Sequence, residues 1–146
     1  MNDAFFSTLK SNFRAFAEKG FAGLNNGNEL EDEPYLRLLA YEFEKVLTGE
    51  TKKLSVSMPP RHGKTFFGSV CLPAFLIGHD PSLQILIVSY GETVSREIVS
   101  KIRRIMLSDW YKKTFPKARL WKRQVTDLET TKGGRVFGVS ALQGHF

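Results

Sequence analysis

The sequence predicts an α/β fold in which helices cover both faces of a mainly parallel sheet. Two apolar runs, residues 54–58 and 85–88, have the composition of short strands, and the second is continuous, as in a strand buried on both faces. Stretches of helical period follow these runs, over residues 64–77 and 93–108. Strands that alternate with helices favour a parallel sheet, and 146 residues suffice for one such domain.

Residues 1–33 form an N-terminal unit in this prediction. Phenylalanine and leucine recur at spacings of three and four between residues 3 and 19, which predicts an amphipathic helix that ends at Gly20. This apolar stripe favours packing against a neighbouring element or a partner over a ligand site. Residues 21–33 are rich in glycine and asparagine and predict a loop.

Residues 34–146 form the second unit. Pro34 suits the first turn of a helix, and the apolar spacing that follows continues to Gly49. Near the other end of the chain, residues 127–131 and 135–139 flank the tripeptide Lys132-Gly133-Gly134. This pattern predicts a β-hairpin with the glycines in its turn.

The segment between the first predicted strand and its helix holds the residues with the clearest chemistry. It reads Met58-Pro-Pro-Arg-His-Gly-Lys-Thr65, and a strand, a loop ending in Gly-Lys-Thr and a helix are the layout of a phosphate-binding P-loop. Gly63 lets the backbone approach phosphate oxygens, Lys64 can place a positive charge between the β- and γ-phosphates, and the Thr65 hydroxyl is a natural Mg²⁺ ligand. Met58 stands where the usual pattern has its first glycine. The alternative interpretation is an ordinary strand–turn–helix with a solvated Lys64.

The positive charge of the chain is concentrated in one stretch. The net charge is +6, but the stretch from residue 101 to residue 123 alone contributes +8, with nine basic residues and one acid. Basic residues interleaved with aromatic ones can follow the phosphate backbone of double-stranded DNA. A solvated helix face followed by a loop is the alternative. The basic residues are Lys101, Arg103, Arg104, Lys112, Lys113, Lys117, Arg119, Lys122 and Arg123.

Composition argues against several other classes of protein. No apolar run approaches the roughly 20 residues that span a bilayer, and the first residues lack the pattern of a signal peptide. The single cysteine, Cys71, excludes an internal disulfide and is expected to be a small buried hydrophobe. Three scattered histidines without cysteine partners argue against a zinc site. These features predict a cytosolic protein.

The phosphate-binding segment also resembles a particular family. Pro59-Pro-Arg-His-Gly-Lys-Thr65 is similar to the signature of the large terminase subunits of tailed bacteriophages, the ATPases that drive viral DNA into a preformed capsid. The resemblance covers about residues 34–146, because further landmarks follow in the order of that family and at about its spacing. They are Pro34-Tyr-Leu-Arg-Leu-Leu-Ala40, Thr48-Gly-Glu-Thr-Lys-Lys-Leu54, Gly78-His-Asp-Pro81, Ile85-Leu-Ile-Val-Ser-Tyr90, Trp110-Tyr111, Phe115-Pro116 and Gly133-Gly134.

The resemblance implies a P-loop NTPase fold, with ATP and Mg²⁺ as cofactors and Lys64 and Arg61 as catalytic groups. Arg61 would sense or stabilise the γ-phosphate, or else support the loop through a salt bridge, while His62 would act through its backbone only. Tyr35 would either stack on adenine or pack in the core, and Leu36 replaces a polar residue that many relatives have beside it. Nucleotide contact is implied for Pro60, Arg61, His62, Gly63, Lys64 and Thr65.

The resemblance implies partners as well. They are double-stranded DNA, the small terminase subunit, the portal and further copies of the same subunit in a ring. The implied compartment is the host cytoplasm, and no membrane partner is implied. ATP hydrolysis in this family also needs an apolar strand that ends in an acidic pair, and neither this strand nor the nuclease domain is found in the sequence. We therefore expect the N-terminal portion of a terminase ATPase domain, incomplete at its C-terminus and inactive in hydrolysis by itself.

Two alternatives stay open at this level. The chain can be a non-catalytic nucleotide- or DNA-binding fragment, or it can belong to another P-loop ATPase of helicase type. The Pro-Pro-Arg-His lead and the downstream landmarks argue against the helicase type.

Overall fold

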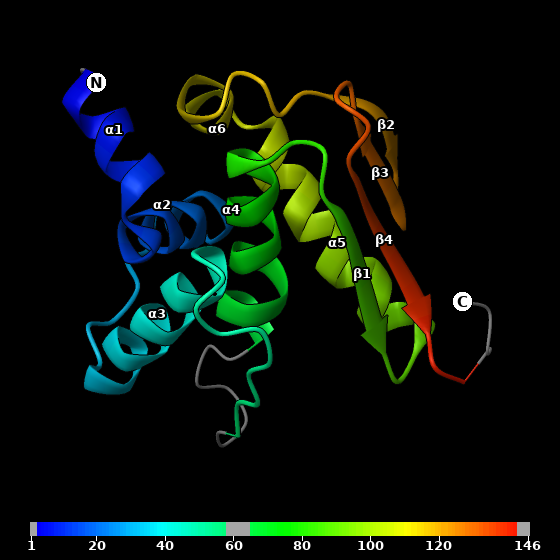
Figure 1. Cartoon of the computed structure of the whole chain (residues 1–146), viewed down its shortest axis with the longest axis horizontal. Coiled ribbons are helices and arrows are strands. Elements are labelled where there is room, and N and C mark those ends of the chain that lie inside the picture. Colours follow the sequence, from blue (N-terminus) through cyan, green and yellow to red (C-terminus); the bar gives the residue numbers. More distant parts are fainter. Residues whose placement is uncertain (1–2, 58–64, 143–146) are drawn as a thin grey trace.

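The computed structural model describes residues 3–57 and 65–142, in which a layer of helices packs on one face of a four-stranded sheet (Figure 1). The helices are α1 (Asp3–Ser11), α2 (Phe13–Leu24), α3 (Pro34–Leu47), the π-helical η1 (Phe66–Cys71), α4 (Leu72–His79), α5 (Glu92–Leu107) and α6 (Asp109–Thr114). The strands are β1 (Gln84–Ser89), β2 (Leu120–Gln124), β3 (Asp127–Thr130) and β4 (Arg135–Ser140).

The sheet is mixed, so the prediction of a mainly parallel P-loop sheet is wrong. Its strand order is β1-β4-β3-β2, and only β1 and β4 run parallel. The pairs β4–β3 and β3–β2 are antiparallel, because short turns join these strands and a short turn reverses the chain. Gly133 in the β3–β4 turn has a φ of 86°, a value that glycine adopts without steric cost.

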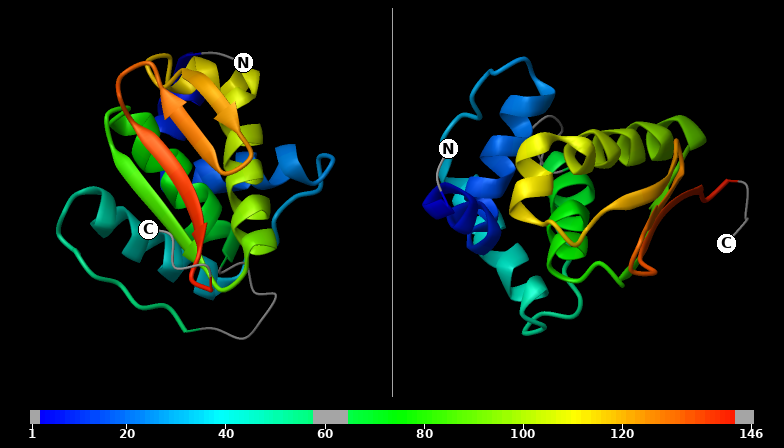
Figure 2. Two further views of the ribbon diagram at one scale, coloured as in Figure 1. Left: turned by 90° about the vertical axis from the view of Figure 1, so that its right-hand side faces the viewer. Right: turned by 90° about the horizontal axis from the view of Figure 1, so that it is seen from above.

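Helices cover only one face of the sheet in the described part of the chain, which corrects the expectation of helices on both faces. The left view of Figure 2 shows all four strands in front of the helices. On the covered face Gly138 lies so close to α5 that an added Cβ would meet Val99 at 2.9 Å. On the other face Leu86 and Val88 of β1 are 52% and 50% exposed. The apolar composition of β1 had predicted burial on both faces, and this too is wrong.

The predicted N-terminal helix is two helices. Asn12 interrupts it, because its side chain accepts a hydrogen bond from the Ala15 backbone N–H at 3.0 Å and so caps α2. Gly20 does not end α2, which continues to Leu24. Instead Gly20 allows close packing, since an added Cβ would lie 3.3 Å from Ile105 of α5.

Aromatic rings fill the interior of the helical layer. The predicted packing of the N-terminal stripe is confirmed, because Phe13 and Phe16 are fully buried in the same core cluster as Phe67, Phe75 and Phe115. The Phe16 ring meets the Phe75 ring edge-on, with their centroids 5.1 Å apart. Such offset and edge contacts stabilise a core beyond the area that they bury. Cys71 is buried within this cluster, which confirms the expectation that it is a small buried hydrophobe.

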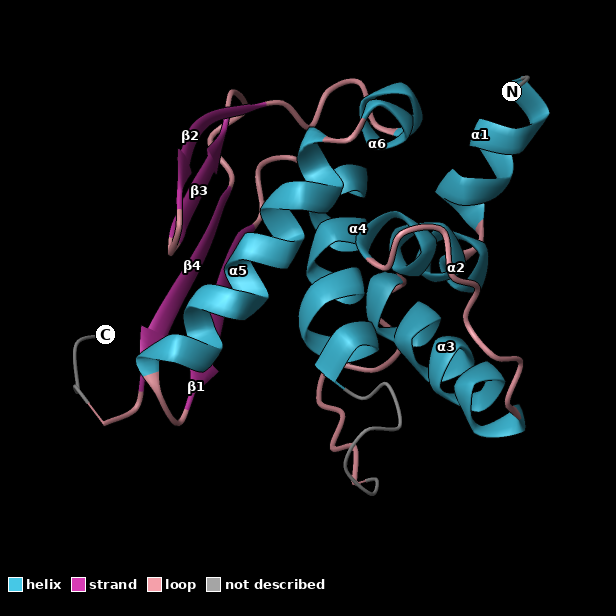
Figure 3. Cartoon of the chain, turned by 180° about the vertical axis from the view of Figure 1, so that it is seen from behind, coloured by secondary structure: helices cyan, strands magenta, loops and turns pink. Residues whose placement is uncertain are grey.

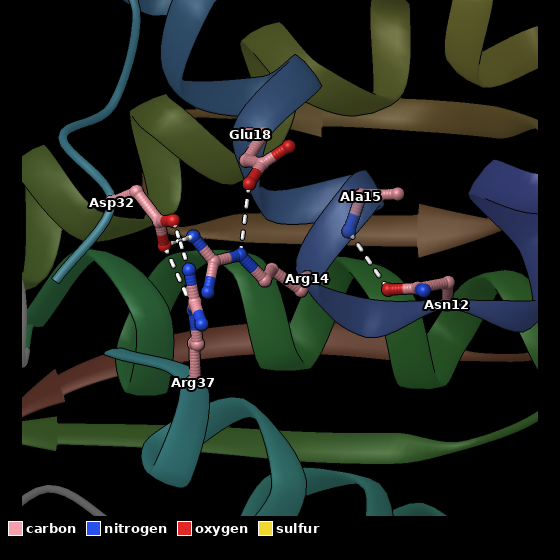
Figure 4. A network of polar contacts seen from close by, with 6 residues as sticks. All are labelled: Asn12, Arg14, Ala15, Glu18, Asp32 and Arg37. Carbon is pink, nitrogen blue, oxygen red and sulfur yellow. Dashed lines mark hydrogen bonds and ion pairs between the residues drawn. The ribbon is translucent and has the colours of Figure 1, made fainter. Parts of the chain in front are cut away.

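A polar network on the surface connects α2 with α3 through the loop between them (Figure 4). Arg14 of α2 and Arg37 of α3 both donate to the carboxylate of Asp32, and Arg14 also donates to Glu18 at 2.8 Å. Hydrogen bonds from Arg37 and then from Arg14 lower the pKa of Asp32 to about 2. The network is exposed, so it adds a modest link between α2 and the start of α3 to the apolar contacts of the core.

Other predictions have mixed outcomes. Helix α3 begins at Pro34 and α5 lies where the apolar spacing placed it, so both are confirmed, and so is the β3–β4 hairpin. Residues 54–57 are not a strand, and residue 58 lies outside the described residues. Helix α6 and strand β2 lie in the basic stretch and were not predicted. Within the described residues, the structure has no helix with the length and apolar character that crossing a membrane requires.

Candidate phosphate-binding site

Most of the predicted phosphate-binding loop lies outside the described residues. Met58 and all the predicted nucleotide contacts from Pro60 to Lys64, which include Arg61, His62 and Gly63, belong to residues 58–64. Thr65 is described and has helical dihedral angles, φ −65° and ψ −43°. It is exposed and stands directly before η1, which continues into α4. The predicted helix after the loop is therefore confirmed from Thr65 onward.

The first turns after Thr65 are π-helical. The N–H of Leu72 donates to the carbonyl of Phe67, five residues earlier, at the end of η1. Such turns are rare in proteins and occur frequently at functional sites. The first N–H groups of any helix also lack partners within that helix, which favours anions at this end.

A pocket of about 430 Å³ adjoins Thr65. It lies between the C-terminal half of α3, the extended segment that follows α3 (Figure 1), and the start of η1. Its volume falls within the range of small-molecule sites, and its walls are about equally polar and apolar. The lining residues are Phe43, Val46, Lys52, Leu54, Val56, Thr65, Gly68, Ser69 and Leu72.

Tyr35, the predicted base-stacking residue, is not among the residues that line this pocket. Its side chain is half-buried and packs against the core cluster, in agreement with the alternative of core packing. Phe43 lies eight residues further along α3, about 12 Å along a helix axis. Sequence reasoning placed Phe43 and Val46 on the apolar stripe of α3, but no pattern distinguished them from the other core positions.

Electrostatics at the pocket favour an anion. Lys52 is the charged residue in the lining, and Thr65 and Ser69 add hydroxyl groups. In the parts of the chain that the structure describes, no three His, Cys, Asp or Glu side chains come together as a metal site. A Mg²⁺ ion at this place would be held by phosphate oxygens together with the exposed Thr65 hydroxyl, which matches how this ion is usually bound beside nucleotides.

The basic stretch forms a second surface. It runs over the second half of α5, α6 and β2, which lie along the top of the molecule in the view of Figure 3. Lys113, Lys117 and Arg123 are exposed there. Lys122 differs from them, since its ammonium contacts Asp127 at 2.7 Å and Glu129 at 3.5 Å. Its charge is therefore already compensated within the sheet.

Comparisons of this chain with models of protein families, with curated proteins and with solved structures found no match.

Proposed function

We propose that this chain is the ATP-binding portion of a large terminase subunit, the motor that couples ATP hydrolysis to the movement of viral DNA into a procapsid. One observation supports this function best. The sequence Gly63-Lys64-Thr65 stands directly before a helix that begins with a π-helical turn, and Thr65 borders a pocket of about 430 Å³. The order of the terminase-like landmarks along residues 34–146 supports the family assignment.

In this proposal the loop before η1 binds the phosphates. We propose that backbone N–H groups of residues 61–65 donate to the phosphate oxygens, and that the first N–H groups of the helix add to this site. Lys64 and a Mg²⁺ ion held by Thr65 offset the charge on the β- and γ-phosphates. Arg61 has a guanidinium that can donate two parallel hydrogen bonds to γ-phosphate oxygens.

The family assignment brings further proposals. Double-stranded DNA is the nucleic-acid partner, and the small terminase subunit, the portal and other copies of the same subunit in a ring are the protein partners. The host cytoplasm is the compartment. The basic surface of α5, α6 and β2 is the part of the described structure best suited to DNA, because its exposed lysines and arginines can lie against phosphates.

Calorimetric titration with MgATP tests the phosphate site. We expect Lys64→Ala to weaken binding by about ten- to a hundredfold, because a charge-assisted contact is worth roughly 1.5–3 kcal/mol. Lys53→Ala is the matched control, since Lys53 is exposed and does not line the pocket, and it should keep the wild-type affinity. Equal affinities of the wild type and Lys64→Ala, with unchanged far-ultraviolet circular dichroism, would refute the phosphate site.

The salt dependence of DNA binding tests the basic surface. Neutralising Lys112, Lys113, Lys117 and Arg123 together should lower the salt slope by several units, because each phosphate contact releases close to one counterion. Lys122→Ala alone should leave the slope nearly unchanged, because Lys122 is paired with Asp127. An unchanged slope in the fourfold variant would show that this surface is only solvated.

A further inference from the structure

We infer that the pocket between α3, the segment 52–56 and the start of η1 receives the base and ribose of the bound nucleotide. The inference rests on the proposed phosphate site, and it names a place that the family resemblance does not indicate. That resemblance points to Tyr35, near the opposite end of α3.

Position is the first argument. Thr65 is the last residue of the phosphate-binding motif and also lines the pocket. Ser69 and Leu72 line it one and two turns further along the same helix. The pocket therefore begins where the phosphate site ends, and a nucleotide whose phosphates meet the start of this helix has its ribose and base within reach of it.

The chemistry of the walls fits a base. Five apolar side chains supply surface for the flat faces of a purine ring, as apolar walls do in most small-molecule sites. The ammonium of Lys52 and the hydroxyl of Ser69 can meet the polar edge of the base or the hydroxyls of the ribose. The five apolar residues are Phe43, Val46, Leu54, Val56 and Leu72.

A second pocket of similar size serves as a comparison. It has a volume of about 440 Å³ and lies between α1, α2 and residues 29–30. Two acids, Glu18 and Glu29, line it together with one base, Lys19. Glu18 is paired with Arg14, so the lining offers no excess of positive charge to a nucleoside triphosphate, and no residue of the phosphate-binding motif lies in its wall.

Filling the pocket tests the inference. Leu54→Trp and Val46→Trp each add a large ring to its wall from different elements, and Leu54 is 38% exposed, so its replacement leaves the core intact. Thr8→Trp adds the same ring to the second pocket and is the matched control. Binding of ATP and of inorganic tripolyphosphate, each with Mg²⁺, is measured for all variants by calorimetry, and folding is checked by circular dichroism.

The two ligands separate the base site from the phosphate site. We expect the wild type and Thr8→Trp to bind ATP at least about tenfold more tightly than tripolyphosphate, a difference of about 1.4 kcal/mol. The two pocket variants should lose this preference while their affinity for tripolyphosphate stays unchanged. Folded pocket variants that retain the full preference for ATP, or that lose affinity for both ligands equally, would overturn the inference. A wild type that binds neither ligand would overturn the proposed function as well.

Discussion

The two faces of the sheet are stabilised in different ways. Towards the helices, Ile87 of β1 is only 9% exposed and belongs to the core cluster around Phe13 and Phe16. Towards the outside, its neighbour Leu86 is half exposed, and that face carries ion pairs. Asp127 of β3 accepts hydrogen bonds from Arg135 at 2.7 Å and from Lys122 at 2.7 Å.

This difference shows that the apolar composition of a strand does not determine how deeply it is buried. Both faces of β1 carry apolar side chains, but only the face of Ile87 is buried against the core cluster of the described residues. Stability is therefore expected to depend on the covered face and, to a lesser degree, on the ion pairs of the outer face. Four substitutions measure how unequal the contributions of the core and of the two faces are.

The largest effect is expected in the aromatic core. Phe16→Ala removes a fully buried ring that meets the rings of Phe75, Trp110, Tyr111 and Phe115. We expect a loss of about 3–5 kcal/mol in the free energy of unfolding, because the cavity left behind adds to the lost burial. Urea unfolding followed by circular dichroism measures it. A loss below about 1 kcal/mol would show that the core is not centred on this ring.

An intermediate effect is expected at the ionic contacts of the outer face. Asp127→Asn leaves Arg135 and Lys122 without their carboxylate, and we expect a loss of about 1–3 kcal/mol near neutral pH. Hydrogen bonds from Arg135 and Lys122 hold the pKa of Asp127 below its ordinary value of 3.8. A lowered pKa means that this stabilisation is fully present above the unfolded pKa and is lost as the pH falls through the folded pKa.

The pH dependence supplies the control for this substitution. The difference between the wild type and Asp127→Asn should be constant from about pH 5 to pH 7 and should shrink as the pH falls below 3.8. Unfolding curves at several pH values measure this. A difference that is independent of pH down to pH 2 would mean that packing, and not charge, explains the loss.

The smallest effect is expected on the apolar part of the outer face. Leu86→Ala should change stability by less than about 0.5 kcal/mol, as surface substitutions usually do. Ile87→Ala, one position along the same strand, should cost about 2–5 kcal/mol because its side chain is buried. Similar losses in both variants at a protein concentration where the chain is monomeric would contradict the one-sided burial of β1.

Local patterns predicted some elements well. Pro34 marked the start of α3, and the glycines of the 132–134 turn marked the hairpin of β3 and β4, because both signals act through neighbouring residues. The break at Asn12 also had a local signal, since asparagine favours the N-cap position, but the apolar spacing continued through it. The prediction that Gly20 ends the helix was wrong. This glycine instead allows a close contact with Ile105, which is far away in the sequence.

Strand order and direction depend on distant pairings and were not predictable from local patterns. The parallel pairing of β1 with β4 joins residues 84–89 to residues 135–140, and no turn signal specifies it. Strand β2 was not predicted, because its lysine and arginine residues indicated a solvated loop. At the candidate site, the motif predicted a helix directly after the loop, and this helix is confirmed from Thr65 onward. The pocket instead depends on how α3 and the segment 52–56 come together.

Hydrogen exchange with and without MgATP tests the location of the site most directly. At saturating MgATP we expect slower exchange of the amides in the segment 52–56 and in η1, where the pocket lies, and unchanged exchange in β2, β3 and the second pocket. At a MgATP concentration near the Kd of the wild type, Lys64→Ala should show much weaker slowing than the wild type, because its affinity is about ten- to a hundredfold lower. Protection that appears only around the second pocket, or protection that is equally strong in Lys64→Ala at this concentration, would contradict a nucleotide site at the start of this helix.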